Sequence, residues 1–159
     1  MQYLVSGKEM KLLDQNTSSK FHVPELVLME QAAMTFVRRL FFLQKKYHKE
    51  ISNALILCGS GNNGADGLAI ARLLMQEGLT SCVCLCGEAA GHKMTESYQT
   101  QKAICQAYQI RMEEQIPEEK FDLVIDALFG IGLSRNIEGE LAEVIRQANE
   151  MRGWKVAVD

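Results

Sequence analysis

The sequence predicts an α/β protein with a mostly parallel sheet. From residue 53 onward, apolar strand-like runs alternate with helix-like segments. The first run, residues 54–58, is continuous and ends in a glycine, which is typical of a buried parallel strand. Strands separated by helices indicate right-handed crossovers, which place helices on both faces of the sheet.

The composition is that of one globular domain. The chain has 159 residues, of which 47% are hydrophobic and 23% are charged, and this length can bury a substantial core. A net charge of −3 disfavours a nucleic-acid binder, because such proteins usually carry a basic excess. We find no signal peptide and no apolar stretch of roughly 20 residues, so we expect no membrane association and a cytoplasmic location.

Two helices are expected in residues 1–46, ahead of the strand-helix core of residues 53–159. Ser6 and Glu9 have the spacing of a capping box, which predicts a short helix from about residue 7 to residue 17. Pro24 suits the first position of a second helix, which reaches Lys46.

Within the core, the remaining elements follow in alternation. We expect strands at residues 81–86, 121–128 and 155–158, and helices at residues 68–76, 95–108 and 141–149. Asp159 directly follows the fourth strand, at the edge where open sheets of this kind place their active sites. We therefore expect a domain truncated at its C-terminal end, within a longer protein.

Five cysteines are present, and their pattern is structural. Cys82, Cys84 and Cys86 alternate, which places three thiols on one face of a strand. No second cluster of Cys or His stands at metal-ligand spacing. We expect reduced cysteines that act as small buried hydrophobic residues.

Residues 59–67, the first loop, carry the clearest functional signal. Residues 59–64 match the glycine pattern G-x-G-x-x-G between a strand and a helix, where backbone amides can approach a phosphate. Glu88 follows the second strand, roughly where a ribose-binding acid falls in an ordinary NAD-binding fold. On spacing alone, an NAD-dependent oxidoreductase is one hypothesis.

Three polar residues sharpen the interpretation of the first loop. Asn62, Asn63 and Asp66 add amide oxygens and a carboxylate, which suit a bound cation as well as sugar hydroxyls. The alternative is structural, because Asn tolerates left-handed turns and caps helices. A dehydrogenase does not need this set of polar residues after the glycine pattern.

A second group of candidates surrounds residues 130–136, the second loop. Asp126 lies inside an apolar strand, where an unpaired carboxylate is costly, so we expect it to have a cation, amide or hydroxyl partner. Arg135 suits a phosphate, although a surface salt bridge is an equally simple role. Asp159 ends the next strand, so Asp126 and Asp159 belong to one edge of the sheet.

Together these features resemble the NAD(P)H-hydrate epimerase family, the YjeF N-terminal domain. Residues 3–10 resemble its opening, with Asp14 behind them, and residues 27–33 resemble its next signature. The Asn-Asn-Gly-x-Asp-Gly loop, the Asp-Ala-Leu-Phe-Gly-x-Gly-Leu segment and the final Val-Ala-Val-Asp follow in the family's order. The resemblance covers the whole chain.

The resemblance implies a three-layer α/β/α Rossmann-like sandwich, a homodimer, and a site that holds potassium. It implies K⁺ ligation by Asn63 and Asp126, and a catalytic role for Asp159. The implied substrate-binding residues are Asn62, Asn63, Gly64, Ala65, Asp66, Gly130, Ile131, Gly132, Leu133, Ser134, Arg135, Asn136 and Asp159. The family's Ile-Pro-Ser-Gly after Asp159, with a further potassium ligand, is not part of this sequence.

Two residues depart from the family pattern. Ala65 replaces a usual Gly, which adds a methyl group that we expect close to the phosphate path. Ile131 replaces a common Thr, which removes a hydroxyl from the second loop.

The implied function is epimerisation of the R and S forms of NADH or NADPH hydrated at C6 of the nicotinamide ring. The resemblance also implies a fused dehydratase domain in the longer protein. Besides the oxidoreductase, a catalytically silent scaffold module is an alternative, because the same fold serves that role in some RNA-processing proteins. The intact Asn63, Asp66, Asp126 and Asp159 favour the enzyme.

Overall fold

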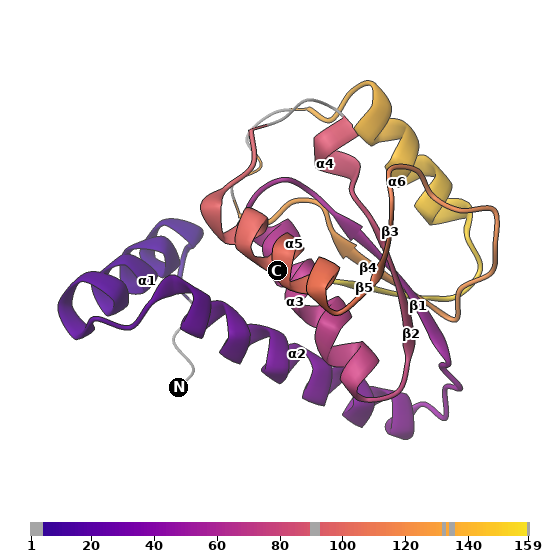
Figure 1. Cartoon of the computed structure of the whole chain (residues 1–159), viewed down its shortest axis with the longest axis horizontal. Helices are drawn as coiled ribbons and strands as arrows, with labels where there is room; N and C mark the ends of the chain where they lie inside the picture. Colours follow the sequence, from indigo (N-terminus) through magenta and orange to yellow (C-terminus); the bar gives the residue numbers. More distant parts are fainter. Residues whose placement is uncertain (1–4, 90–92, 132, 134–135, 159) are drawn as a thin grey trace.

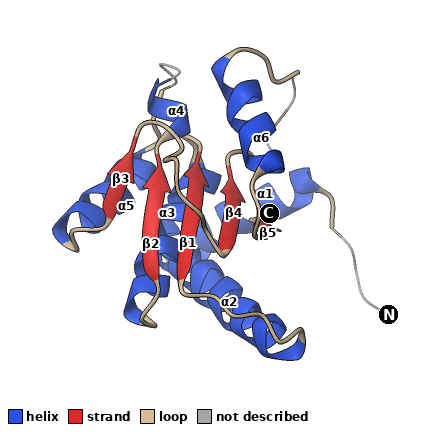
Figure 2. Cartoon of the chain, turned by 90° about the vertical axis from the view of Figure 1, so that its right-hand side faces the viewer, coloured by secondary structure: helices blue, strands red, loops and turns tan. Residues whose placement is uncertain are grey.

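The fold is a five-stranded parallel sheet that carries helices on both faces. The computed structural model describes residues 5–89, 93–131, 133 and 136–158. The strand order is β3-β2-β1-β4-β5, and every neighbouring pair is parallel. Figure 2 shows the strand arrows pointing the same way, with β1 at the centre. The strands are β1 (Asn53–Cys58), β2 (Thr80–Cys84), β3 (Arg111–Glu113), β4 (Leu123–Ala127) and β5 (Trp154–Ala157).

The helices form two layers on opposite sides of the sheet, as Figure 1 shows. The helices α2, α3 and α5 cover one face, and α4 and α6 lie over the other. The helices are α1 (Gly7–Phe21), α2 (Glu25–Lys46), α3 (Asn62–Gln76), α4 (Cys86–Ala89), α5 (Glu96–Ala107) and α6 (Glu140–Glu150). This arrangement confirms the predicted three-layer sandwich. Among these helices, none is long and apolar enough to cross a membrane.

Each face of the sheet has its own hydrophobic core, because side chains alternate along a strand. Ile56 and Ile125 face α2, α3 and α5. Leu57 and Val124 face the other layer, where Leu141 of α6 packs on them. The central strands are therefore buried on both faces, as the continuous apolar run in β1 predicted.

The cysteines behave as the alternation predicted. Cys82, Cys84 and Cys86 all belong to the core on the α6 side. All five cysteines are buried and none forms a disulfide. The prediction of small buried hydrophobic residues is confirmed.

The N-terminal helices differ sharply in how they attach to the body. α1 begins with the predicted capping box, in which Ser6 Oγ accepts from the amide of Glu9 and the Glu9 carboxylate accepts from the amide of Ser6. Although it runs to Phe21, past the expected end at residue 17, none of its residues is buried. α2 instead packs on α3, where Glu30 forms an ion pair with the nearly buried Arg72.

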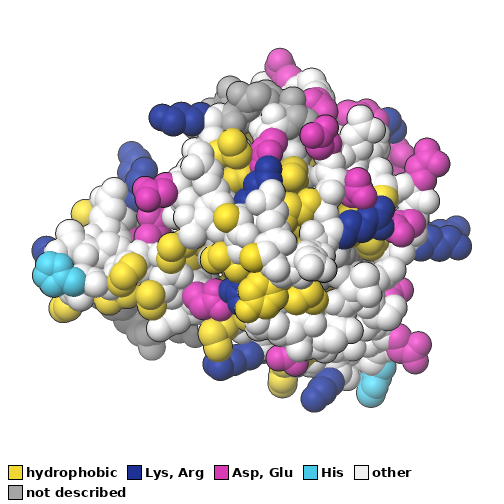
Figure 3. Space-filling model, in the orientation of Figure 1, with side chains coloured by type: hydrophobic (Ala, Val, Ile, Leu, Met, Phe, Trp, Pro, Cys, Tyr) yellow, Lys and Arg dark blue, Asp and Glu magenta, His cyan; other side chains and the backbone are white. Residues whose placement is uncertain are grey.

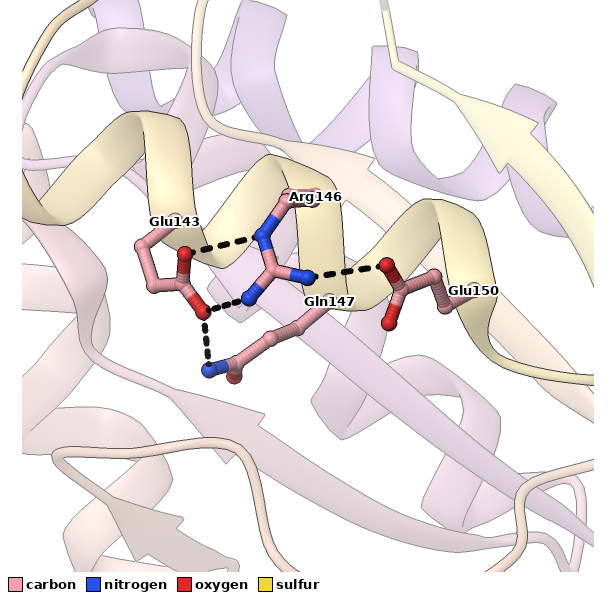
Figure 4. Close-up of polar contacts among 4 residues, drawn as sticks. All are labelled: Glu143, Arg146, Gln147 and Glu150. Carbon is pink, nitrogen blue, oxygen red and sulfur yellow. Dashed lines mark hydrogen bonds and ion pairs between the residues drawn. The ribbon is translucent and has the colours of Figure 1, made fainter.

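α6 shows its charged residues to solvent. Arg146 forms ion pairs with Glu143 one turn before it and with Glu150 one turn after it (Figure 4). Gln147 also donates to Glu143. Exposed pairs of this spacing contribute little to stability, so α6 is held mainly by its apolar face.

Two elements were not foreseen, and a third begins earlier than expected. The short strand β3 was missed, so the sheet has five strands where the pattern predicted four. Its residues Arg111 to Glu113 lack an apolar run, and pairing with β2 makes them a strand. The four-residue helix α4 was also missed, and α3 begins at Asn62 rather than at Leu68.

Candidate active site

The first loop is shorter than its sequence suggests, because the following helix starts early. β1 ends at Cys58, and α3 begins at Asn62 with Gly61 as its extended N-cap residue. Asn62 to Asp66 therefore lie in the first turns of α3. The first N–H groups of a helix lack acceptors within it, so this end of α3 suits a negatively charged group.

Two glycines allow the close packing of this loop. A Cβ on Gly64 would lie 1.7 Å from the carbonyl oxygen of Gly59. A Cβ on Gly59 would lie 2.1 Å from the carbonyl oxygen of Leu128, which follows β4. Gly59 also donates its amide hydrogen to the carbonyl of Ala127, at 3.1 Å. The first loop is thus pressed against the chain that leaves β4.

Asn63 lies where the two loops meet. A Cβ on Gly130 would lie 3.3 Å from Asn63 Oδ1. The side-chain amide nitrogen of Asn63, Nδ2, is buried and has no hydrogen-bond partner among the described residues. The sheet register pairs Leu57 with Asp126, so the ends of β1 and β4 are neighbours. The structure therefore brings both loops to the carboxyl edge of the sheet.

Asp126 lies near the end of β4 with an exposed side chain, and it has the amide partner that the sequence predicted. Its register partner on β5, Ala157, is exposed too, which makes this corner of the sheet open. Asp126 Oδ1 accepts a hydrogen bond from the amide of Leu128, at 3.0 Å. The carboxylate is therefore available to a ligand at the edge.

The other side chains of the first loop have separate surroundings. Asn62 donates from Nδ2 to Glu25 Oε1 of α2, at 2.6 Å. Ala65 is completely buried in the core, so the expectation that its methyl group lies close to the phosphate path is wrong. Asp66 faces a cavity next to α1 and α2.

This cavity, the acidic cavity, has a volume of about 490 Å³. Three acidic groups, Asp14, Glu25 and Asp66, face a single basic one, Lys11. Burial raises the pKa of Asp66 to about 7, and the charges of Glu25 and Asp14 add to this effect. The cavity is lined by Lys11, Asp14, Gln15, Ser18, Glu25, Leu28, Met29, Ala32, Asn62 and Asp66.

A second cavity, the Lys93 cavity, lies where β1, β2 and β4 end, and its volume is about 270 Å³. Its walls combine glycine backbone, a hydroxyl and apolar side chains with one cation. The described residues that line it are Gly59, Ser60, Gly87, Lys93, Leu128, Phe129 and Leu141.

The described residues of the second loop lie largely on the surface. Ile131 is 62% exposed and Leu133 is 46% exposed, and the amide of Leu133 donates to the carbonyl of Gly130. Asn136 is also exposed. The side chain of Ile131 touches Gly7 at the start of α1, which links this loop to the N-terminal helix. Of the predicted site residues, Gly132, Ser134, Arg135 and Asp159 lie outside the described residues.

Glu88 has the position of a ribose-binding acid, but its carboxylate is already hydrogen-bonded within the protein. Both of its carboxylate oxygens accept from Lys102 Nζ, at 2.6 and 2.7 Å. One of them also accepts from the hydroxyl of the buried Tyr98. This arrangement removes the support that Glu88 lent to an ordinary NAD-dependent oxidoreductase.

Comparison with known proteins decides the family. Residues 25–159 match the family model described as YjeF-related protein N-terminus. The chain belongs to this family. The match takes in every described residue of the two loops and of the sheet, and so confirms the resemblance found from the motifs.

Relatives of the YjeF N-terminal family match along nearly the full chain. A protein of Limosilactobacillus fermentum named NAD(P)H-hydrate epimerase is 40% identical, covering 98% of this chain and 72% of that protein. One of the same name from Lentilactobacillus buchneri is 38% identical, covering 100% of this chain and 72% of that protein. The crystal structure of the yeast protein YNL200c has the same fold, with a TM-score of 0.72 at 24% identity, over 99% of this chain and 70% of that one.

Asn63 and Asp126 fit the potassium ion that the family resemblance implies. Asn63, in the first turn of α3, provides an amide oxygen, and Asp126, near the end of β4, provides a carboxylate. Hard cations prefer such oxygen donors. Among the described residues, no group of three or more His, Cys, Asp or Glu residues is placed to hold a metal, so a tighter transition-metal site is not seen there.

Several residues at these cavities could not be found from the sequence. Glu25 and Lys11 reach the first loop from helices far away in the chain, and Lys93 follows a segment without a recognisable motif. Among the residues of α1 that line the acidic cavity, Asp14 alone had a signal, because it belongs to the family's opening.

Proposed function

We propose that this chain interconverts the R and S epimers of hydrated NADH and NADPH. The observation that carries the proposal is the meeting of the two loops, with Asn63 against Gly130 at the edge where Asp126 is exposed. The names of the bacterial relatives support the same reaction. Pairing of Glu88 with Lys102 weighs against hydride transfer with an ordinary NAD-binding mode.

The reaction needs a group that can exchange a proton with the C6 hydroxyl. The lone pair of the ring nitrogen assists cleavage of the C6–O bond, and the departing oxygen takes a proton and leaves as water. Water then adds to the resulting iminium-like carbon from the opposite face and gives up a proton. We assign both proton transfers to Asp159, whose carboxylate also stabilises the positive charge between the two steps.

Potassium, when bound, supplies a positive charge that orients the loops and the substrate. Asn63 and Asp126 are the residues that would hold it, and neither transfers a proton in this scheme. Because the side chain of Asp126 is exposed, Asp126→Asn is expected to leave the fold intact while it removes the ion's charged ligand.

Asp159→Asn tests the proposed function. General acid–base catalysis contributes about 10²–10⁴-fold, so kcat on the separated R epimer should fall by about that factor. Titration with NADH should show unchanged binding, since the amide keeps the shape of the carboxyl group. Both epimers are assayed with and without potassium, and Glu150→Gln on the outer face of α6 is the control for loss of a carboxylate. Unchanged turnover of the R epimer in the variant would refute the assignment.

We further propose that the active form is a homodimer in which α1 joins the two copies. A helix of this length is marginal in water without tertiary packing, yet none of its residues is buried. Apolar side chains are visible on the part of the surface that α1 forms (Figure 3). The exposed large apolar residues of α1 include Leu12, Leu13 and Phe21.

Leu13→Glu should convert the dimer to a monomer, as measured by light scattering during gel filtration. Tyr108→Glu, at the end of α5, changes an equally exposed apolar residue and should leave the dimer intact. A monomeric parent protein, or a Leu13 variant that is still dimeric, would contradict the proposed interface. A cytoplasmic location and a dehydratase domain in the longer protein stay predictions, to be checked by fractionation and by the complete gene.

A further inference from the structure

The Lys93 cavity lies at the position where an open sheet of this topology binds ligands. The strand order β3-β2-β1-β4-β5 means that the chain builds outward from β1 in one direction and then resumes at β4 on its other side. Ligands bind in the crevice outside the carboxyl ends of the two strands where the order reverses. Ser60 follows β1 and Phe129 follows β4, and both residues line the cavity.

The charge of the cavity is that of an anion site. Lys93 is the one charged side chain among the described residues that line it, and it forms no ion pair with any described residue. The hydroxyl of Ser60 likewise makes no hydrogen bond within the described part of the chain, although its carbonyl accepts from the amide of Thr95. A cation and a hydroxyl are therefore both available to phosphate oxygens.

The acidic cavity cannot serve the same group. Its three carboxyl groups outnumber Lys11, so it repels phosphate and favours a cationic group. The two cavities adjoin the same first loop, since Asn62 and Asp66 line one and Gly59 and Ser60 line the other. Their opposite charges leave the Lys93 cavity as the one suited to the phosphates.

The size of the cavity matches a part of a dinucleotide rather than the whole. Its volume of about 270 Å³ lies below the range of about 300–1,000 Å³ that is usual for complete small-molecule sites. Gly87 packs closely against Ser60 in the wall of the cavity, and a Cβ at this position would lie 2.3 Å from the backbone nitrogen of Ser60. Beyond Phe129 the chain continues directly to Gly130, which touches Asn63.

We propose that the Lys93 cavity binds the diphosphate of the hydrated dinucleotide, and that Lys93 is the cation that selects for it. This inference rests on the proposed function. The diphosphate in this cavity places the nicotinamide half beyond Gly130, towards Asn63 and Asp126. Lys93 contributes to substrate binding and takes no part in the proton transfers.

Binding of ADP tests the subsite without any turnover. Lys93→Gln should raise the dissociation constant for ADP about tenfold in calorimetric titrations, and Lys93→Arg should restore most of the affinity. Lys45→Gln, in the exposed last turn of α2, removes the same charge far from the cavity and should bind ADP like the parent protein. Equal affinity in the Lys93→Gln and Lys45→Gln variants would overturn the proposal.

Kinetics separate this inference from the proposed function. Lys93→Gln should raise KM about tenfold for hydrated NADH, with little change in kcat. It should not change KM for hydrated dihydronicotinamide riboside, which lacks phosphate. An increase for both substrates would contradict a phosphate role for Lys93. If the parent protein epimerises neither hydrate but still binds ADP through Lys93, the proposed reaction fails while the subsite stands.

Discussion

The two loops at the carboxyl edge of the sheet are held in place very differently. In the first loop, the positions of side chains at Gly59 and Gly64 are already filled by backbone atoms. In the second loop, the atoms nearest to a Cβ at Gly130 would belong to the Asn63 side chain, at 3.3 to 3.6 Å, and Ile131 and Leu133 are exposed. The fold itself therefore sets the shape of the first loop, whereas the described residues of the second loop are held by fewer close contacts.

This difference predicts where substitutions affect folding and where they affect function. Changes in the first loop should mainly alter the free energy of unfolding, in either direction. Changes in the second loop should mainly alter activity. Three substitutions, in decreasing order of their expected effect on stability, test the comparison.

Gly64→Ala should have the largest effect, because its methyl group would overlap the carbonyl oxygen of Gly59. We expect a loss of more than about 3 kcal/mol in the free energy of unfolding, measured by urea denaturation. Gly61→Ala is the matched control, since no atom lies within 4 Å of its Cβ position and its φ of −92° suits any residue. It should cost less than about 1 kcal/mol. Similar losses in both variants would show that the loop is not tightly packed.

Asp66→Asn should increase stability above pH 7. Burial raises the pKa of Asp66 from its ordinary value of 3.8 to about 7, and Glu25 of α2 and Asp14 of α1 reinforce the shift, while Lys11 faces the same cavity. Between pH 3.8 and pH 7, Asp66 is ionised in the unfolded chain but still protonated in the folded one. Stability therefore falls as the pH rises through this range and levels off above pH 7.

The expected gain from Asp66→Asn is about 1–2 kcal/mol at pH 8, less than the full shift implies because the carboxyl group is not fully buried. Denaturation curves at pH 4, 6 and 8 measure it. Asp122→Asn should show the opposite sign, because hydrogen bonds from Ser52 lower the pKa of Asp122. A gain that is the same at pH 4 and pH 8 would exclude the titration of Asp66 as its cause.

Gly130→Ala should have the smallest effect on stability, less than about 1 kcal/mol, because a flexible side chain can move away from the new methyl group. It should nevertheless lower kcat/KM for hydrated NADH about tenfold, because it displaces Asn63 from the edge. The effect should vanish when Asn63 is already replaced by Ala, as a double-mutant cycle measures. Additive losses in that cycle would mean that Gly130 acts independently of Asn63.

The sheet could be predicted from the sequence wherever burial on both faces leaves an apolar run. Ala54 to Cys58 is such a run, and the structure places it at the centre of the sheet. The three residues of β3 contain two charged side chains and depend on their pairing with β2, which no local pattern reveals. The start of α3 was misplaced because glycine and asparagine are poor helix formers, and the packing of the loop against β4 overrides that preference.

The candidate site could be predicted where its residues are neighbours in the sequence. Asn62, Asn63 and Asp66 were visible because they follow a strand and a glycine pattern. The exposure of Asp126 was not, because it depends on β5 leaving a corner of the sheet uncovered. The contact between Asn62 and Glu25 likewise joins residues that only the packing of α2 on α3 brings together.

The buried thiols give each layer of the molecule its own chemical reporter. Cys82, Cys84 and Cys86 lie in the core beneath α6, whereas Cys58 and the α5 residue Cys105 lie in the core on the opposite side of the sheet. A thiol reagent can reach a buried cysteine only when the layer above it opens. Modification of the first group alone therefore records opening on the α6 side while the other side stays closed. The order in which the five cysteines react shows which half of the fold opens first.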